Sequence, residues 1–148
     1  MPLGKWALLL FIFALPHSLL SQQQLVDSLQ QLVDVHTEED TAKVKLMSQL
    51  AFAYRSTNPA ECRRLADEIK NLSLKINYPK GIGVSYQLTG ISHSIQGEYG
   101  IALNSYILAL DVFRQIDDSI AIGKNLSNIA GIYYNQNKFQ EAEEYSRN

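Results

Sequence analysis

The sequence contains little cysteine, little proline and no excess of positive charge, and each shortage excludes a class of protein. Because Cys62 is the only cysteine among 148 residues, an internal disulfide framework and a zinc site built on paired cysteines are excluded. Four prolines and eight glycines are too few for a collagen-like or low-complexity chain. With 13 basic and 15 acidic side chains, nothing indicates a nucleic-acid surface or a polybasic membrane footprint. The 46% hydrophobic content that remains is typical of one folded, mildly acidic domain.

The first residues differ in character from the rest of the chain. Lys5 is followed by an unbroken apolar run over residues 6–15, then by Pro16-His17-Ser18 and a polar segment at residues 21–24. This order is that of a secretory signal peptide, and the run is about half the length that a membrane span requires. We therefore expect a signal peptide over residues 1–21 and export to the periplasm or the exterior. The alternative is an uncleaved hydrophobic anchor.

The remaining chain resembles itself at an offset of 40 residues. Aromatic residues fall on aromatic ones, small residues fall on small ones, and the turn at residues 96–98 falls on residues 136–138. A period of 20 to 50 residues is typical of a solenoid, in which similar units stack. The identical pairs at this offset include Ile76 with Ile116, Ile82 with Ile122, Gly83 with Gly123, Gln96 with Gln136, and Ala102 with Ala142.

Each unit is predicted to contain two helices. In the middle unit, residues 81–95 form the first helix, and Gly97 ends it because glycine readily takes the left-handed conformation of a helix C-terminus. The second helix begins near Tyr99, and Asp117-Asp118 closes the unit before Ser119 caps the next helix. The face that the first helix is expected to bury carries Ile82, Tyr86, Gly90 and His93.

An amphipathic helix precedes the repeats. It covers residues 22–36, and Thr37-Glu38-Glu39-Asp40 is similar to a capping box that opens the first repeat. The expected organisation is an N-terminal capping helix over 22–36, repeats over 37–80 and 81–120, and an incomplete repeat over 121–148. Because the second helix of that last repeat stops at Asn148 without a cap, we expect a longer chain. The alternative is a short protein whose last helix frays or pairs with another copy, so the uncapped end is also a candidate surface for self-association.

Two sets of residues, one in each of the last two units, carry a family resemblance. They are Gly90, Gly97, Tyr99, Ala102, Tyr106 and Ala109 in the second unit, and Ala130, Tyr133, Asn137, Phe139 and Ala142 in the third. This pattern resembles the tetratricopeptide repeat, although its period of 40 residues exceeds the usual value of about 34. The resemblance implies an all-α fold, an antiparallel helical-hairpin solenoid that winds as a right-handed superhelix. An exported array of this kind resembles the N-terminal sensory region of bacterial sensor histidine kinases, which implies a transmembrane helix and a cytoplasmic output domain beyond it.

No residue pattern indicates catalysis, a metal site or a cofactor. His36 is expected to be solvated and His93 half-buried, with no carboxylate near enough in sequence to orient the His93 ring. Gly81-Ile82-Gly83 starts like a dinucleotide-binding loop, but no third glycine and no preceding strand accompany it. We therefore expect a non-enzymatic chain without cofactor or metal. An enzyme would need acid, base and nucleophile clustered in one groove, and His93 alone is too little.

The resemblance instead implies a binding groove formed by the first helix of each hairpin. Its side chains mix apolar surface with amides, hydroxyls and a few cations, which suits an extended peptide or a protein segment. We expect such a partner, with no nucleic acid and no membrane contact by the repeats. The alternative function is a stand-alone exported adaptor without signalling. The groove residues expected are Arg55, Gln87, Ile91, Ser94, Lys124, Ser127, Tyr134 and Asn135, together with Lys45, Ser48, Phe52 and Ile95.

Overall fold

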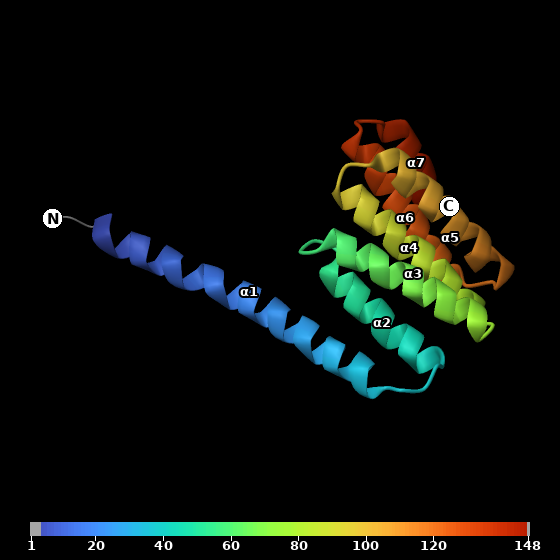
Figure 1. Cartoon of the computed structure of the whole chain (residues 1–148). Coiled ribbons are helices and arrows are strands. Elements are labelled where there is room, and N and C mark those ends of the chain that lie inside the picture. Colours follow the sequence, from blue (N-terminus) through green and yellow to red (C-terminus); the bar gives the residue numbers. More distant parts are fainter. Residues whose placement is uncertain (1–3, 148) are drawn as a thin grey trace.

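The computed structural model describes residues 4–147, with side chains from residue 20 onward, and this part of the chain forms seven α-helices. The expected all-α fold is confirmed. After the long α1, short turns join helices that run in alternating directions (Figure 1). The pairs α2 with α3, α4 with α5, and α6 with α7 therefore form three hairpins. The helices are α1 Gly4–Val35, α2 Thr41–Tyr54, α3 Pro59–Lys75, α4 Pro79–Ile95, α5 Tyr99–Gln115, α6 Ser119–Asn135 and α7 Phe139–Arg147.

The side chains of Asp40, Asn58 and Asp118 cap the starts of α2, α3 and α6. Asp40 accepts a hydrogen bond from the Lys43 backbone N–H at 2.9 Å, which satisfies one of the unpaired donors at the start of α2. Asp118 does the same for α6, at 3.0 Å from the Ala121 nitrogen. Two expectations are corrected here: Asp40 caps α2 where Thr37 was expected, and Asp118 caps α6 while Ser119 is its first helical residue.

One turn geometry recurs between α3 and α7. The middle residues of four successive turns, Asn77, Gly97, Asp117 and Asn137, all have positive φ, between 52° and 77°. In each turn the following backbone N–H donates to a carbonyl five residues earlier, so the last helical carbonyls are satisfied. The predicted C-terminal role of Gly97 is confirmed, and the other three turns achieve the same backbone with asparagine or aspartate.

Each helix packs against the next one along the chain, and α4 also contacts α2 and α6. The first helices of the three hairpins therefore form a row, α2–α4–α6. One cluster of buried apolar residues joins α1 to α4 and includes Leu50 and Ile69, and a second joins α5 to α6 and includes Tyr106 and Ile129. Ala102 and Ala142, which the offset of 40 residues pairs, are both buried.

The central helix α4 is buried mainly through small residues. Of the face expected to be buried, Gly90 is buried, whereas Ile82, Tyr86 and His93 are only half-buried. The difference arises because α4 has neighbours on several sides, and small side chains let them approach closely. Its buried residues are Gly81, Gly83, Ser85, Leu88, Gly90 and Ser92.

Helix α1 is longer than the expected capping helix and runs from Gly4 through Pro16 to Val35. Its contacts are with α2, through the buried Val26 and Leu29, and its N-terminal part extends beyond the other helices (Figure 1). Residues 1–3 and the side chains of the apolar run, both within the expected signal peptide, lie outside the described part, as does residue 148. Within the described residues, no helix combines the length and the apolar character that a membrane crossing requires.

Candidate peptide-binding groove

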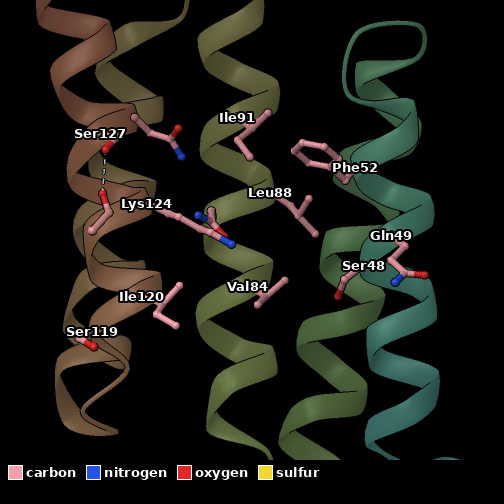
Figure 2. Close-up of a pocket in the computed structure, with 13 residues that line it drawn as sticks. Ser48, Gln49, Phe52, Val84, Leu88, Ile91, Ser119, Ile120, Lys124 and Ser127 are labelled. Carbon is pink, nitrogen blue, oxygen red and sulfur yellow. Dashed lines mark hydrogen bonds between the residues drawn. The ribbon is translucent and has the colours of Figure 1, made fainter.

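A groove of about 730 Å³ opens along the row of helices α2, α4 and α6. Figure 2 shows side chains from all three helices pointing into it, with Phe52 directed from α2 toward α4 and Lys124 extending from α6 toward α4. The residues that line it are Ser48, Gln49, Phe52, Val84, Gln87, Leu88, Ile91, Ser119, Ile120, Gly123, Lys124, Ser127 and Asn128.

The apolar side chains of the groove are partly uncovered. Ile120 is 73% exposed and Phe52 is 48% exposed, whereas Leu88 between them is buried and supports the floor. Apolar surface left open to water gains free energy when a partner covers it, by roughly 25 cal/mol per Å². The groove therefore offers an unfilled apolar contact surface and not a closed cavity.

Two of the three serine hydroxyl groups that line the groove are hydrogen-bonded to their own helices. Ser48 Oγ donates to the Val44 carbonyl at 2.6 Å, and Ser127 Oγ donates to the Gly123 carbonyl at 2.9 Å. Such bonds hold the hydroxyl protons within the helix, so neither serine is prepared as a nucleophile by a neighbouring base. The polar character available to a ligand comes chiefly from amides and from the Lys124 ammonium group.

Two smaller hollows continue the groove at its ends. One of about 330 Å³ between α1 and α2 shares Gln49 and Phe52 with the central groove and includes Arg55. The Arg55 guanidinium lies 3.9 Å from the centre of the Phe52 ring and donates to the Phe52 carbonyl at 2.8 Å. The other, also about 330 Å³, shares Ser127 and lies between α6 and α7. The hollows form a continuous path from α1 to α7.

The residues predicted for the groove are distributed along this path. The central groove is lined by six of them, Ser48, Phe52, Gln87, Ile91, Lys124 and Ser127. Arg55 lines the hollow beside α1, whereas Tyr134 and Asn135 line the hollow beside α7. The residues that line these three hollows do not include Ser94.

Some lining residues were not anticipated from the sequence. Ile120 lies one helical turn before Lys124, and Val84 lies one turn before Gln87 and Leu88, so extending the predicted stripe by one turn would have identified both. Gln49 lies beside the predicted Ser48. Gly123 could not be predicted as a groove residue from the sequence, because only the packing of α6 places its backbone at the surface of the groove.

His93 has a carboxylate partner, contrary to expectation. Its Nδ1 is hydrogen-bonded to Glu98 Oε2, five residues along the chain. The neighbouring Ser92 is fully buried, donates to the Pro59 carbonyl at 2.9 Å and accepts from Arg63 Nη1 at the same distance. Ser92 therefore joins α3 to α4, and the residues that line the groove do not include His93.

The single cysteine is buried and has a weakly acidic thiol. Burial raises the pKa of Cys62 to about 11, so the thiol remains protonated near neutral pH and is a poor nucleophile. Its Sγ lies 3.8 Å from the Leu88 carbonyl oxygen. Within the described residues, no group of three or more His, Cys, Asp or Glu side chains is placed to hold a metal ion.

Comparison of the chain with protein families, with curated proteins and with solved structures finds no match. What is established is therefore an all-α fold whose seven described helices pack against their neighbours. The function has to be argued from the groove itself.

Proposed function

We propose that this chain is a non-enzymatic recognition module that holds an extended peptide or a protein segment in the groove on α2, α4 and α6. The observation that carries the proposal is the continuous, partly uncovered apolar path along three helices, with Phe52 and Ile120 exposed at its walls. A long open groove with scattered amides suits a flexible segment better than a compact small molecule, which binds in an enclosed pocket.

The proposed architecture is a tetratricopeptide-like solenoid with a repeat of about 40 residues and a right-handed superhelical path. Helix positions support it, because α3, α5 and α7 begin at Pro59, Tyr99 and Phe139, each 40 residues after the last, and α6 begins 40 residues after α4. The contacts of α4 with both α2 and α6 are those expected when hairpins stack in one direction. In this arrangement the row of first helices forms the concave, ligand-binding side.

Export is part of the proposal, with removal of residues 1–21 as a signal peptide. Removal of these residues is compatible with the described contacts of α1, because the buried Val26 and Leu29 and the bond from Gln22 Nε2 to the Ala53 carbonyl at 3.3 Å would all be retained. Fusing residues 1–40 to an alkaline phosphatase that lacks its own leader tests this, because that enzyme is active only after export. An inactive fusion that accumulates in the cytoplasm contradicts export.

We further propose that the module is the sensory part of a membrane signalling protein of the sensor histidine kinase type. Occupancy of the groove would then favour one of two conformations that differ in affinity for the ligand. The competing proposal is a stand-alone exported adaptor. The reading frame after Asn148 separates them, because an apolar segment of about 20 residues followed by a helical dimerisation segment supports the sensor, and a stop codon supports the adaptor.

Selection from a random peptide library displayed on phage tests the binding function. Peptides enriched on the immobilised protein should lose about ten-fold or more in affinity for the double variant Phe52→Gln, Ile120→Gln. The matched control is Ile107→Gln, Leu108→Gln, which replaces two exposed apolar residues on α5, outside the groove. Circular dichroism should show equal helicity for both. Binding that survives the groove substitutions, or falls equally in the control, contradicts the proposal.

A further inference from the structure

Charge is unevenly distributed between the helices. The three groove helices α2, α4 and α6 contain four of the chain's 13 basic side chains and none of its 15 acidic ones. The acidic residues lie on α1, on the outer helices α3, α5 and α7, and in the turns. The row of groove helices thus carries only positive charge, whereas the outer helices mix both signs: α3 has four basic and three acidic side chains, α5 has one of each, and α7 has one basic and three acidic.

Two cations of this row, and Arg55 directly after α2, lie along the groove. Lys124 lines its centre, and Arg55 lines the hollow beside α1. Lys45 is exposed one helical turn before Ser48 and Gln49, which places it on the same side of α2. None of the ion pairs among the described residues involves these three cations, although the charge of Lys124 helps to lower the pKa of Asp118.

Two carboxylates directly precede helices of this row, and both are already engaged: Asp40 caps α2 and is hydrogen-bonded to His36 at 2.9 Å. Asp118 precedes α6, caps it, and pairs with Lys80 Nζ at 2.8 Å. The hydrogen bond from Lys80 and the backbone bond from Ala121 hold the pKa of Asp118 below its usual range, so it stays ionised and bound to them. This pair neutralises Lys80 but leaves Lys45, Arg55 and Lys124 to face a ligand.

We infer that the partner held in the groove is an acidic segment of another protein, in which Asp or Glu residues are interspersed with apolar ones. The apolar side chains would cover the exposed surfaces of Phe52 and Ile120, and the carboxylates would meet Lys45, Arg55 and Lys124. Complementary charge steers such a segment to the groove, where the helices carry basic side chains and no acidic ones. Arg55, held against the Phe52 ring, presents a planar guanidinium that suits a carboxylate. This inference rests on the proposed function and names the chemistry of its ligand.

Three labelled peptides of about 12 residues test the inference. They repeat Gly-X-Leu, with X as Glu, Gln or Lys, and carry one uncharged dye, so that only the charge differs. Fluorescence anisotropy should give the Glu peptide a Kd about ten-fold or more below that of the Gln peptide, with the Lys peptide weakest. This advantage should shrink when NaCl rises from about 50 to about 300 mM, because salt screens exposed charges.

Variants in which one basic residue is replaced by an acidic one show which part of the protein causes the preference for the Glu peptide. Lys124→Glu should remove the preference for the Glu peptide, whereas Arg114→Glu, the same change in charge on the outer helix α5, should alter its Kd by less than about two-fold. The inference is overturned if the Glu and Gln peptides bind equally, or if Arg114→Glu acts as strongly as Lys124→Glu. If the Glu and Gln peptides bind equally and the double variant Phe52→Gln, Ile120→Gln binds neither, the groove is a binding site but has no preference for charge. If no peptide binds, including those selected from the library, the proposed function fails as well.

Discussion

At the scale of single residues, Gly90 marks a close approach between α4 and α5. A β-carbon built at this position would lie 2.7 Å from the buried Tyr106 ring. Alanine stabilises a helix interior relative to glycine, but here the ring would have to move within a packed core. We expect Gly90→Ala to lower the free energy of unfolding by about 1 to 2 kcal/mol, as measured by urea denaturation.

Gly131 on α6 provides the matched control. Nothing lies within 4 Å of a β-carbon built there, so the substitution changes stability only through the preference of a helix interior for alanine over glycine. Gly131→Ala should raise the free energy of unfolding by about 0.5 to 1 kcal/mol. If both variants change stability in the same direction, the close contact between Gly90 and Tyr106 is not a constraint on the fold.

Asp118 should make stability depend on pH. Its folded pKa is lowered by Lys80 and by the Ala121 N–H, so its contribution is present above the ordinary aspartate pKa of 3.8 and is lost as pH falls through the lower folded value. Asp118→Asn keeps an oxygen that can cap α6 but removes the charge that pairs with Lys80. Urea denaturation at about pH 7, 5 and 3 should therefore show a smaller acid-induced loss for the variant than for the unmodified chain. An identical loss in both would show that the pair contributes nothing measurable.

At the scale of elements, the repeated turn connects helices through one left-handed residue, and the residue used differs from turn to turn. Gly97 has a φ of +77° and open space around its α-carbon, so Gly97→Ala should cost about 1 kcal/mol through backbone strain alone. Asp117, with a φ of +53°, occupies the equivalent position after α5. Asp117→Gly should gain up to about 1 kcal/mol, because it relieves that strain and removes a negative charge from a helix C-terminus. Opposite shifts in thermal midpoint confirm the equivalence of the turns, and parallel shifts contradict it.

The helices and turns also show which features of the structure can be predicted from sequence patterns. The helices and the Gly97 turn were predictable because hydrophobic periodicity and a glycine at a helix end are local signals. The same turn at Asn77 and Asp117 was not recognised, since these residues take positive φ less often than glycine. The burial of α4 was partly missed because glycine and serine contribute little hydrophobicity, although they fill most of its buried positions. In the groove, the spacing of Gln87 and Lys124 placed them correctly, but the exposure of Ile120 depends on how α6 packs.

At the scale of the whole molecule, α4 is the helix that packs against the largest number of other helices in the described part of the chain. It packs against α2, α3, α5 and α6, whereas α7 contacts α6 and α1 contacts α2. The groove is built on the same helix, because Val84, Leu88 and Ile91 form its floor and central wall. A partner that occupied the groove would therefore contact the best-supported element, and one that contacted α2, α4 and α6 together would resist their separation.

This distribution of contacts predicts uneven local stability. In a stack where each unit contacts only its neighbours, terminal units open with less free energy than central ones. Hydrogen exchange followed by mass spectrometry should show amides of residues 79–95 exchanging about 100-fold more slowly than those of residues 139–147, whose helix buries only Ala142. Gly90→Ala should raise exchange first in α4 and α5, which share that contact, and leave α7 nearly unchanged. Equal protection from α1 to α7 would mean that the chain opens as a single cooperative unit, and the description of stacked, separable hairpins would then be wrong.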